Sequence, residues 1–319
     1  MNTHHVKASV GTILNGLIDP NVPPVCEVRP GDRVVFDVWS MWSNASQPGL
    51  KLEDALLHRR HTRAAMRGPH PLTGPIKIAG AKPGDVLNVE IERLEIGTHG
   101  VNLITPGGES RGLLADMFPD PALRHFDLDR RTMTTSLGER IRIPLRPFLG
   151  IMGVMPAGDT AYSSSLPGVY GGNIDCPDLI AGTTLHLPVF RDGAGFYAGD
   201  AHASQGCGEI VQTALETSMS EVHVRLSIDE ELSSIERPRA STREHLITMG
   251  FAEDLREAAR QAAADMIDWV VARYKVVKQD AYVLCSLQGD LLITQLVNGI
   301  NGVHMRMPKA IFVAEGGGR

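Results

Sequence analysis

Five chemically capable side chains fall within ten residues of one another in the second half of the chain. They are Asp200, His202, Gln205, Cys207 and Glu209, and the residues between them are Ala, Ser and Gly. Small neighbours leave the polar groups uncrowded and let the backbone approach whatever they bind. Burying such groups costs free energy unless they share a metal ion, a substrate or a proton. This segment is therefore the predicted functional site.

Asp200 and His202 are two residues apart, so on a strand they would lie on one face and could bind a single ion. His70, Asn173 and Asp175 lie in glycine-containing segments and are predicted as further metal ligands. Other interpretations of these three remain open. Asn173 and Asp175 could instead hydrogen-bond within a turn, or offer oxygen ligands to a structural calcium ion. His70 precedes a proline and could simply end a loop.

Glu209 is predicted as a general acid or base, because a carboxylate beside a metal ion can move protons during hydrolysis. Its alternative role is to cap the element that follows it. Cys207 admits a second mechanism, in which its thiol is the nucleophile and His202 or Glu209 is the base. Cys207 could also be a small packed residue, or a thiolate ligand that favours zinc.

The composition excludes several classes of partner. The net charge of −6 comes without a long basic run, which argues against nucleic acid and anionic membranes as partners. No apolar run reaches the roughly 20 residues of a membrane helix. The N-terminus lacks the apolar segment of a secretory signal. The four cysteines are far apart in the sequence and form no CxxC pair, which is typical of reduced thiols in a cytoplasmic protein.

Two-residue alternation of apolar and polar side chains predicts strands with one wet face at 87–92, 140–145 and 222–228. Pro-Gly turns precede β-branched runs near residues 30 and 83. Helical spacing predicts a long helix over 252–274 and a shorter one over 281–286, before a closing strand pair at 291–297 and 303–307. The predicted class is α+β and predominantly β, with sandwich-like or barrel-like lobes and a long helix near the C-terminus. The chain is predicted to form one unit, or two intimate β-rich lobes that divide near residue 150.

Four motifs in order resemble those of the acetamidase/formamidase family of amide hydrolases, from about residue 23 to about residue 312. The matching segments are Pro75–Asp85, Ile143–Val154, Gly168–Leu179 and Leu185–Glu209. The resemblance implies a mostly β fold and hydrolysis of short linear amides to a carboxylate and ammonia. It also implies bound metal ions, zinc among them, a small-molecule amide substrate, and a homodimer or larger homo-oligomer.

The chain departs from the family pattern at three places. Cys207 stands where the family usually has Asp, and Val211-Gln212-Thr213-Ala214 stands where it has Cys-Gly-Thr-Ala. The segment 39–67, with Trp42 and the basic run His58-Arg59-Arg60-His61, is not the usual family sequence and is expected to reshape the pocket. Amide hydrolysis as a class survives these changes, while the identity of the amide does not follow. A non-catalytic relative that binds small amides or metal is the remaining alternative.

Overall fold

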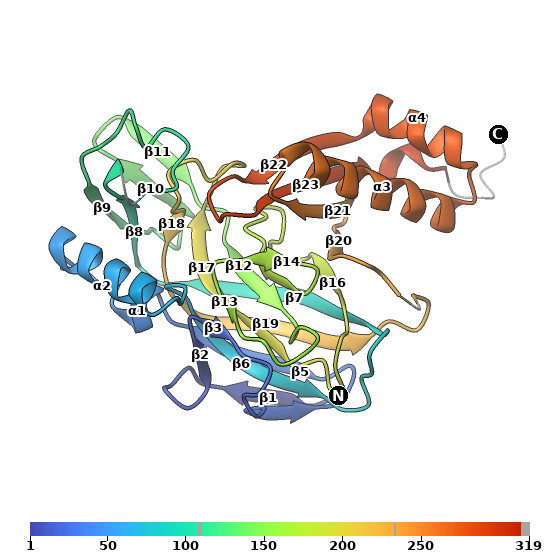
Figure 1. Cartoon of the computed structure of the whole chain (residues 1–319), viewed down its shortest axis with the longest axis horizontal. Helices are drawn as coiled ribbons and strands as arrows, with labels where there is room; N and C mark the ends of the chain where they lie inside the picture. Colours follow the sequence, from blue (N-terminus) through green and yellow to red (C-terminus); the bar gives the residue numbers. More distant parts are fainter. Residues whose placement is uncertain (108–109, 233, 314–319) are drawn as a thin grey trace.

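The computed structural model describes residues 1–107, 110–232 and 234–313, and Figure 1 shows their arrangement. Two large sheets form the body of the protein, with one helical layer at each end of the view (Figure 1). Neither large sheet closes into a barrel. The predicted α+β, predominantly β class is confirmed. The proposed division into two lobes near residue 150 stays a prediction.

The first sheet has nine strands, and all neighbours are antiparallel except the first pair. In spatial order these are β1 (Thr3–Val6), β5 (Arg33–Val38), β19 (Met219–Ile228), β7 (Val86–Ile96), β16 (Thr184–Pro188), β20 (Arg239–Ser241), β21 (His245–Ala252), β23 (Asn301–Pro308) and β22 (Asp290–Gln295).

The second sheet has ten strands and carries the site. Its main path is β14 (Pro167–Gly168), β15 (Gly171–Asn173), β12 (Phe148–Gly153), β17 (Phe196–Ser204), β18 (Leu215–Glu216), β8 (His99–Ile104) and β9 (Ala122–Asp127). β6 (Pro71–Ile78) joins β17 and also pairs with β2 (Ile13–Asn15) and β4 (Cys26–Val28). Two small ribbons pair β10 (Thr134–Leu137) with β11 (Ile141–Pro144), and β13 (Tyr162–Ser163) with β3 (Leu17–Ile18).

The predicted strands are present, and their alternating apolar residues are buried where the strand packs on the main core. Leu87, Val89 and Ile91 of β7 are fully buried, because this central strand packs one face on the main core. The strand predicted at 140–145 exists as β11, and its apolar positions are covered unequally: Ile143 packs half-buried on the main core, and Leu145, just after the strand, is buried there. Ile141 is 53% exposed, because it lies at the end of the two-stranded ribbon of β10 and β11, opposite Leu137 and away from that core.

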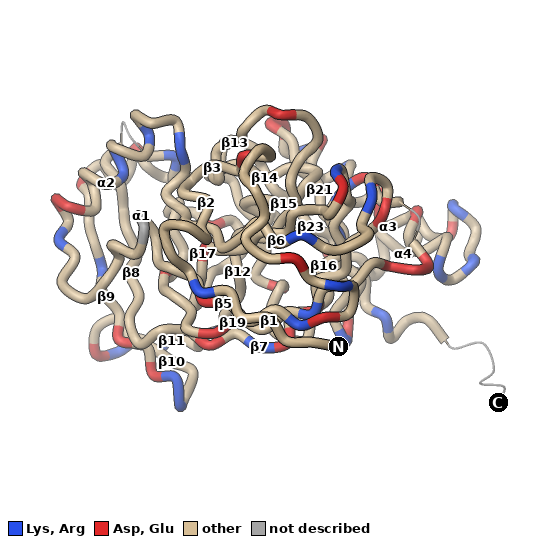
Figure 2. The backbone as a smooth tube through the Cα atoms, turned by 90° about the horizontal axis from the view of Figure 1, so that it is seen from below, with Lys and Arg blue, Asp and Glu red and all other residues tan. Residues whose placement is uncertain are grey.

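Two helices lie beside the second sheet. α1 (Met41–Asn44) and α2 (Leu52–Ala64) pack on a small core of Met41, Trp42, Ala55 and Leu103. Lys and Arg positions gather around α2, as Figure 2 shows. The segment 39–67 that departs from the family pattern therefore forms a helical cover next to β8.

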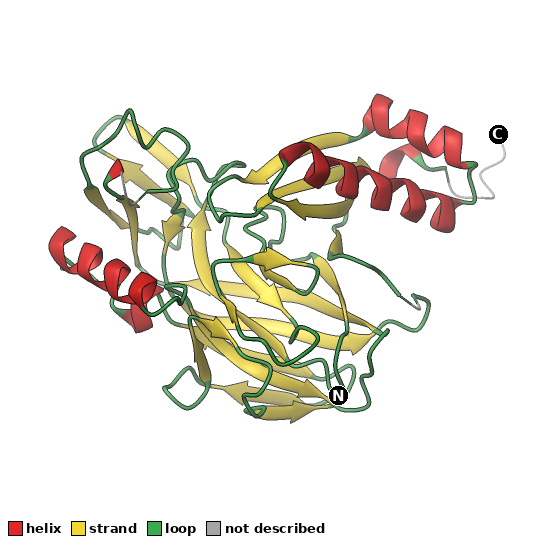
Figure 3. Ribbon diagram, in the orientation of Figure 1, coloured by secondary structure: helices red, strands yellow, loops and turns green. Residues whose placement is uncertain are grey.

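The C-terminal helices pack on the far end of the first sheet (Figure 3). α3 (Leu255–Tyr274) begins three residues later than predicted, because the Asp254 side chain accepts from the Glu257 N–H and caps it. α4 (Lys278–Gln288) is longer than the predicted 281–286. A short 3-10 helix, η2 (Lys309–Ile311), follows the closing strand pair. Among the described residues, no helix combines the length and apolar character needed to cross a membrane.

Candidate functional site

Carboxylates surround the imidazole of His202 on the second sheet. Asp200 and His202 both lie on β17, Glu216 lies on the neighbouring β18, and Asp175 follows β15. His202 Nε2 lies 3.2 Å from Asp200 Oδ2 and 3.3 Å from Glu216 Oε2. On the other side of the ring, Nδ1 lies 3.9 Å from Asp175 Oδ1. The structure thus brings together Asp200, His202 and Asp175, three of the residues predicted as metal ligands.

Three acidic residues of the site adopt a left-handed backbone conformation. The φ angles are 52° for Asp175, 58° for Asp200 and 47° for Glu209. Such conformations are uncommon for residues other than glycine and persist only where the surrounding structure holds them. At all three positions the surrounding structure therefore holds the backbone in a conformation that residues other than glycine rarely adopt.

Several buried polar atoms of the site have no hydrogen-bond partner among the described residues. They are Asp175 Oδ1, His202 Nδ1, Asn173 Oδ1 and Glu209 Oε2. A buried polar atom without a partner costs about 1–3 kcal/mol, and more when it is charged. Ligand atoms of Asp175, Asp200 and His202 all lie within 4.8 Å of one another. This donor set fits a divalent cation, which would satisfy the atoms that the protein leaves unpaired.

Gly150, on β12, leaves the space in which these side chains meet. A Cβ added there would collide with Asp200 Oδ2 and would lie 2.6 Å from Asp175 Oδ1 and 2.8 Å from His202 Cε1. Any side chain at this position would therefore fill the space between the three predicted ligands. The close approach of this backbone is what leaves room for an ion.

The electrostatics of the cluster also favour a cation. Burial, followed by repulsion from Asp200, raises the pKa of Asp175 to about 8. Burial and repulsion from Asp175 raise the pKa of Glu209 well above its usual value. Burial acts on Asp200 in the same direction, but attraction to His202 and His70 and the hydrogen bond from His202 together outweigh it and lower the pKa of Asp200 to about 2. Burial alone would lower the pKa of His202, and the carboxylates beside it raise that pKa instead. A bound cation would replace the protons that the cluster otherwise retains.

The remaining predicted ligands lie at the edge of this group. His70 Nε2 is 3.8 Å from Asp200 Oδ1, and its Nδ1 is 2.9 Å from Ser164 Oγ. Asn173 donates weakly from Nδ2 to the Ser165 carbonyl, at 3.4 Å, and is buried. Both residues line the same cavity as Asp200.

Sequence reasoning missed three residues of the site. Glu216 accepts from the Ala214 N–H at 2.9 Å and faces His202. Its only signal in the sequence was a lone acid after Ala214 and Leu215. Asn298 donates from Nδ2 to Asp175 Oδ2 at 2.6 Å, although its position between the closing strands resembles an ordinary turn. Gly150 carries no side chain, so nothing in the sequence distinguishes it from the other glycines.

A cavity of about 340 Å³ opens over this group. Asp200, Glu209 and Glu216 line it. Cys207 is exposed, and the described residues that line this cavity do not include it. It lies instead on a separate surface depression beside Ile210 and Val211. Among the described residues, Asp200 and Glu216 line the cavity, Cys207 lines the depression, and Glu209 lies between the two and lines both.

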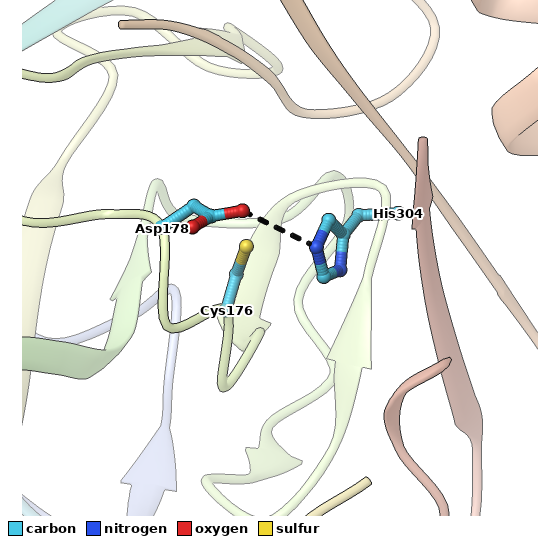
Figure 4. Close-up of side chains that lie close together, drawn as sticks. All are labelled: Cys176, Asp178 and His304. Atoms are coloured by element: carbon cyan, nitrogen blue, oxygen red, sulfur yellow. Dashed lines mark ion pairs between the residues drawn. The ribbon is translucent and has the colours of Figure 1, made fainter. Parts of the chain in front are cut away.

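A second buried group joins Cys176, Asp178 and His304, drawn in Figure 4. His304 Nε2 lies 3.4 Å from Asp178 Oδ2, and its Nδ1 lies 2.7 Å from Thr294 Oγ1. Burial alone would lower the pKa of His304, but Cys176 and Asp178 raise it to about 9. Hydrogen bonding to His304 in turn holds the pKa of Asp178 well below its usual range.

Arginines complete the charge balance of this second group. Arg146 Nη2 lies 2.9 Å from Asp178 Oδ1, and Arg306 Nη1 lies 3.6 Å from Asp178 Oδ2. A carboxylate that already pairs with cationic side chains gains less from a metal ion. The cluster around His202 is therefore the stronger candidate for a metal centre.

The chain is similar to known proteins along most of its length. The family model "Acetamidase/Formamidase family" matches residues 10–166 and 160–314. A formamidase from Methylophilus methylotrophus is 26% identical over 243 residues, which are 60% of this chain and 58% of that protein.

Two solved structures match almost the whole chain. An acetamidase from Bacillus halodurans has a TM-score of 0.85 at 27% identity, covering 97% of this chain and 98% of that one. An acetamidase from Yersinia enterocolitica has a TM-score of 0.84 at 30% identity, covering 98% of this chain and 93% of that one. With the family model matched along nearly its whole length, the chain belongs to the acetamidase/formamidase family.

Proposed function

We propose that this protein hydrolyses short linear amides to a carboxylate and ammonia with the help of a bound divalent metal ion. Family membership supports amide hydrolysis as the reaction. The proposed metal dependence rests on one observation: Asp175, Asp200 and His202 converge, and buried donor atoms among them are left without hydrogen-bond partners. Simple binding of amides or metal would not require an unpaired carboxylate such as Glu209 in the same cavity.

Zinc is the metal that the donor set favours. Asp175, Asp200 and His202 provide a mixed nitrogen and oxygen set, and three protein ligands are typical of catalytic zinc sites. Asn173 and His70 are the additional donors nearest to this set. Calcium, with its preference for oxygen ligands, would gain little from an imidazole. When bound, such an ion polarises the amide carbonyl and lowers the pKa of water.

Side chains of the protein orient the metal ligands and transfer the proton. Asp175, Asp200 and His202 would hold the ion, His202 through its unpaired Nδ1, and the contact of its Nε2 with Glu216 Oε2 would fix the ring orientation. Glu209 accepts a proton from the attacking water and gives it to the amide nitrogen, so that the C–N bond breaks and ammonia leaves. Its buried, unpartnered Oε2 and raised pKa suit it to hold that proton. The backbone near 206–208 is not aimed at this cavity: the Gly208 N–H donates to the Thr294 carbonyl at 2.9 Å, and the described lining of the cavity includes none of these three residues.

The test is ammonia release from formamide, acetamide and propionamide, together with elemental analysis of the purified protein. We expect stoichiometric metal, activity that a chelator abolishes, and activity that added zinc restores. A catalytic thiol would give the opposite pattern, in which activity survives the chelator and is lost on alkylation of Cys207. Metal binding without ammonia release from any amide would contradict the proposal and leave a binding protein.

A further inference from the structure

The cavity over the acidic cluster has a positively charged entrance. Four arginines line it: Arg59, Arg63, Arg67 and Arg111. Three of them are exposed and Arg59 is half-buried, whereas the acids that line the same cavity are at most 8% exposed. The arginines therefore lie toward solvent and the carboxylates lie at the bottom. Figure 2 shows the concentration of Lys and Arg around α2, the helix that carries the first two.

The helix that presents these arginines is fixed in place. Ala55 of α2 is fully buried against Trp42 and Leu103. The ring of Trp42 also stacks on His58, with ring centroids 6.0 Å apart and planes inclined by 15°. Arg59 follows His58 directly. The arginines of this helix are thus held over the cavity by a packed core, and their position does not depend on surface charges alone.

Gln212 ties the two arginine-bearing segments together. Its Oε1 accepts from Arg59 Nη2 at 3.0 Å and from the backbone N–H of Arg111 at 2.8 Å. Gln212 has a φ of 78°, a left-handed conformation that costs about 1–3 kcal/mol for a residue other than glycine. This chain therefore accepts backbone strain at a position where the side chain holds the entrance.

We propose that the natural substrate is an amide that also carries a carboxylate, such as a monoamide of a short dicarboxylic acid. This inference rests on the proposed amide hydrolysis. Arginine binds carboxylates through paired, charge-assisted hydrogen bonds. The acidic floor repels the same carboxylate, so that the amide end enters first and reaches Asp200 and Glu209, which line the cavity. A simple neutral amide would leave the arginine entrance without a ligand.

The experiment compares succinamate with 4-oxopentanamide, in which a methyl ketone replaces the carboxylate at nearly the same size. We expect kcat/KM for succinamate to be higher by about tenfold or more, as expected for hydrogen bonds to charged groups. This preference should shrink as ionic strength rises, because salt screens exposed charges. Equal kcat/KM for the two amides would overturn the inference and leave amide hydrolysis intact.

Variants test whether the arginines at the cavity entrance cause the preference for succinamate. Arg67→Gln combined with Arg111→Gln should move the succinamate to 4-oxopentanamide ratio toward one, mainly through KM. Arg60→Gln is the control, because Arg60 lies on α2 next to Arg59 and is absent from the described lining of the cavity. A ratio unchanged in the double variant would refute the role of the entrance. If that variant does not fold, Arg111→Gln alone makes the same test.

A binding measurement separates this inference from the proposed function. In the metal-loaded Glu209→Gln protein, succinamate should raise the melting temperature more than 4-oxopentanamide does, and Arg111→Gln should remove the difference. If no amide is hydrolysed but this arginine-dependent stabilisation is present, amide hydrolysis fails and recognition of the anion stands. If acetamide is hydrolysed and the stabilisation is absent, recognition of the anion fails alone.

Discussion

Asn298 donates a 2.6 Å hydrogen bond from Nδ2 to Asp175 Oδ2, across 123 residues of sequence. The bond occupies one oxygen of Asp175 and leaves Oδ1 directed at His202, from which it is 3.9 Å away. Outer partners of this kind orient a ligand and tune its affinity for metal.

Replacing Asn298 with alanine should therefore lower metal affinity by about 10- to 100-fold, because the Asp175 carboxylate loses its orienting partner. The measurement is competition for zinc against a chelating dye, with activity measured at saturating metal. Asn301→Ala is the control, since Asn301 donates to the Glu253 carbonyl away from the site. An unchanged zinc affinity in Asn298→Ala would show that Asp175 needs no such support.

Glu209→Gln should reduce amide turnover by about 100- to 10,000-fold, the usual effect of losing a general acid or base. Glutamine keeps the size of the side chain and cannot exchange the proton, so folding and metal content should be retained. Ammonia release, melting temperature and elemental analysis measure the three quantities. Glu27→Gln, at an exposed position, should behave as the unaltered protein. An active Glu209→Gln enzyme would exclude this residue as the proton carrier.

Gly150→Ala should abolish metal binding and activity, because the added methyl group enters the space between Asp200 and Asp175. The control is Gly11→Ala, where a Cβ would meet only Ser9 Oγ at 4.0 Å. Zinc content after dialysis, together with ammonia release, decides the outcome. Full zinc occupancy in Gly150→Ala would mean that the ion lies elsewhere in the protein.

Stability should fall at alkaline pH through His304. The folded pKa of about 9 lies above the ordinary value of 6.5, so this stabilisation is complete below pH 6.5 and is lost as pH rises through 9. A shift of this size, at about 1.4 kcal/mol per pKa unit, corresponds to about 3 kcal/mol at most. Urea unfolding of the metal-free protein at pH 6, 7.5 and 9.5 measures the change.

In His304→Gln the same series should show a flatter dependence, because glutamine has no proton to lose in this range. Parallel curves for the two proteins would mean that the ion pair with Asp178 does not contribute in this way. The comparison also removes the contribution of other groups that titrate at alkaline pH, because both proteins contain them.

Local patterns in the sequence were sufficient for much of the fold. The alternation of Leu87, Val89 and Ile91 with polar residues predicted a strand with one buried face. The structure confirms it, since all three side chains are fully buried on one face of β7. The long helix was found because its apolar residues recur at helical spacing, and only the capping by Asp254 moved its first residue. The same reasoning failed for the burial of Ile141, since alternation does not show which positions of a strand the core covers.

The sequence likewise determined one part of the candidate site, and the tertiary structure decided the rest. The sequence by itself determined that an acid and an imidazole two residues apart, Asp200 and His202, would face one space, because that follows from strand geometry. Only the tertiary structure decided that Glu216 and Asn298 complete the group, since their approach depends on pairing between strands distant in sequence. It also decided that Arg67 and the buried acids share one cavity. Contacts of this kind leave no local signal, because neither residue shows in its own neighbourhood which partner the fold will bring to it.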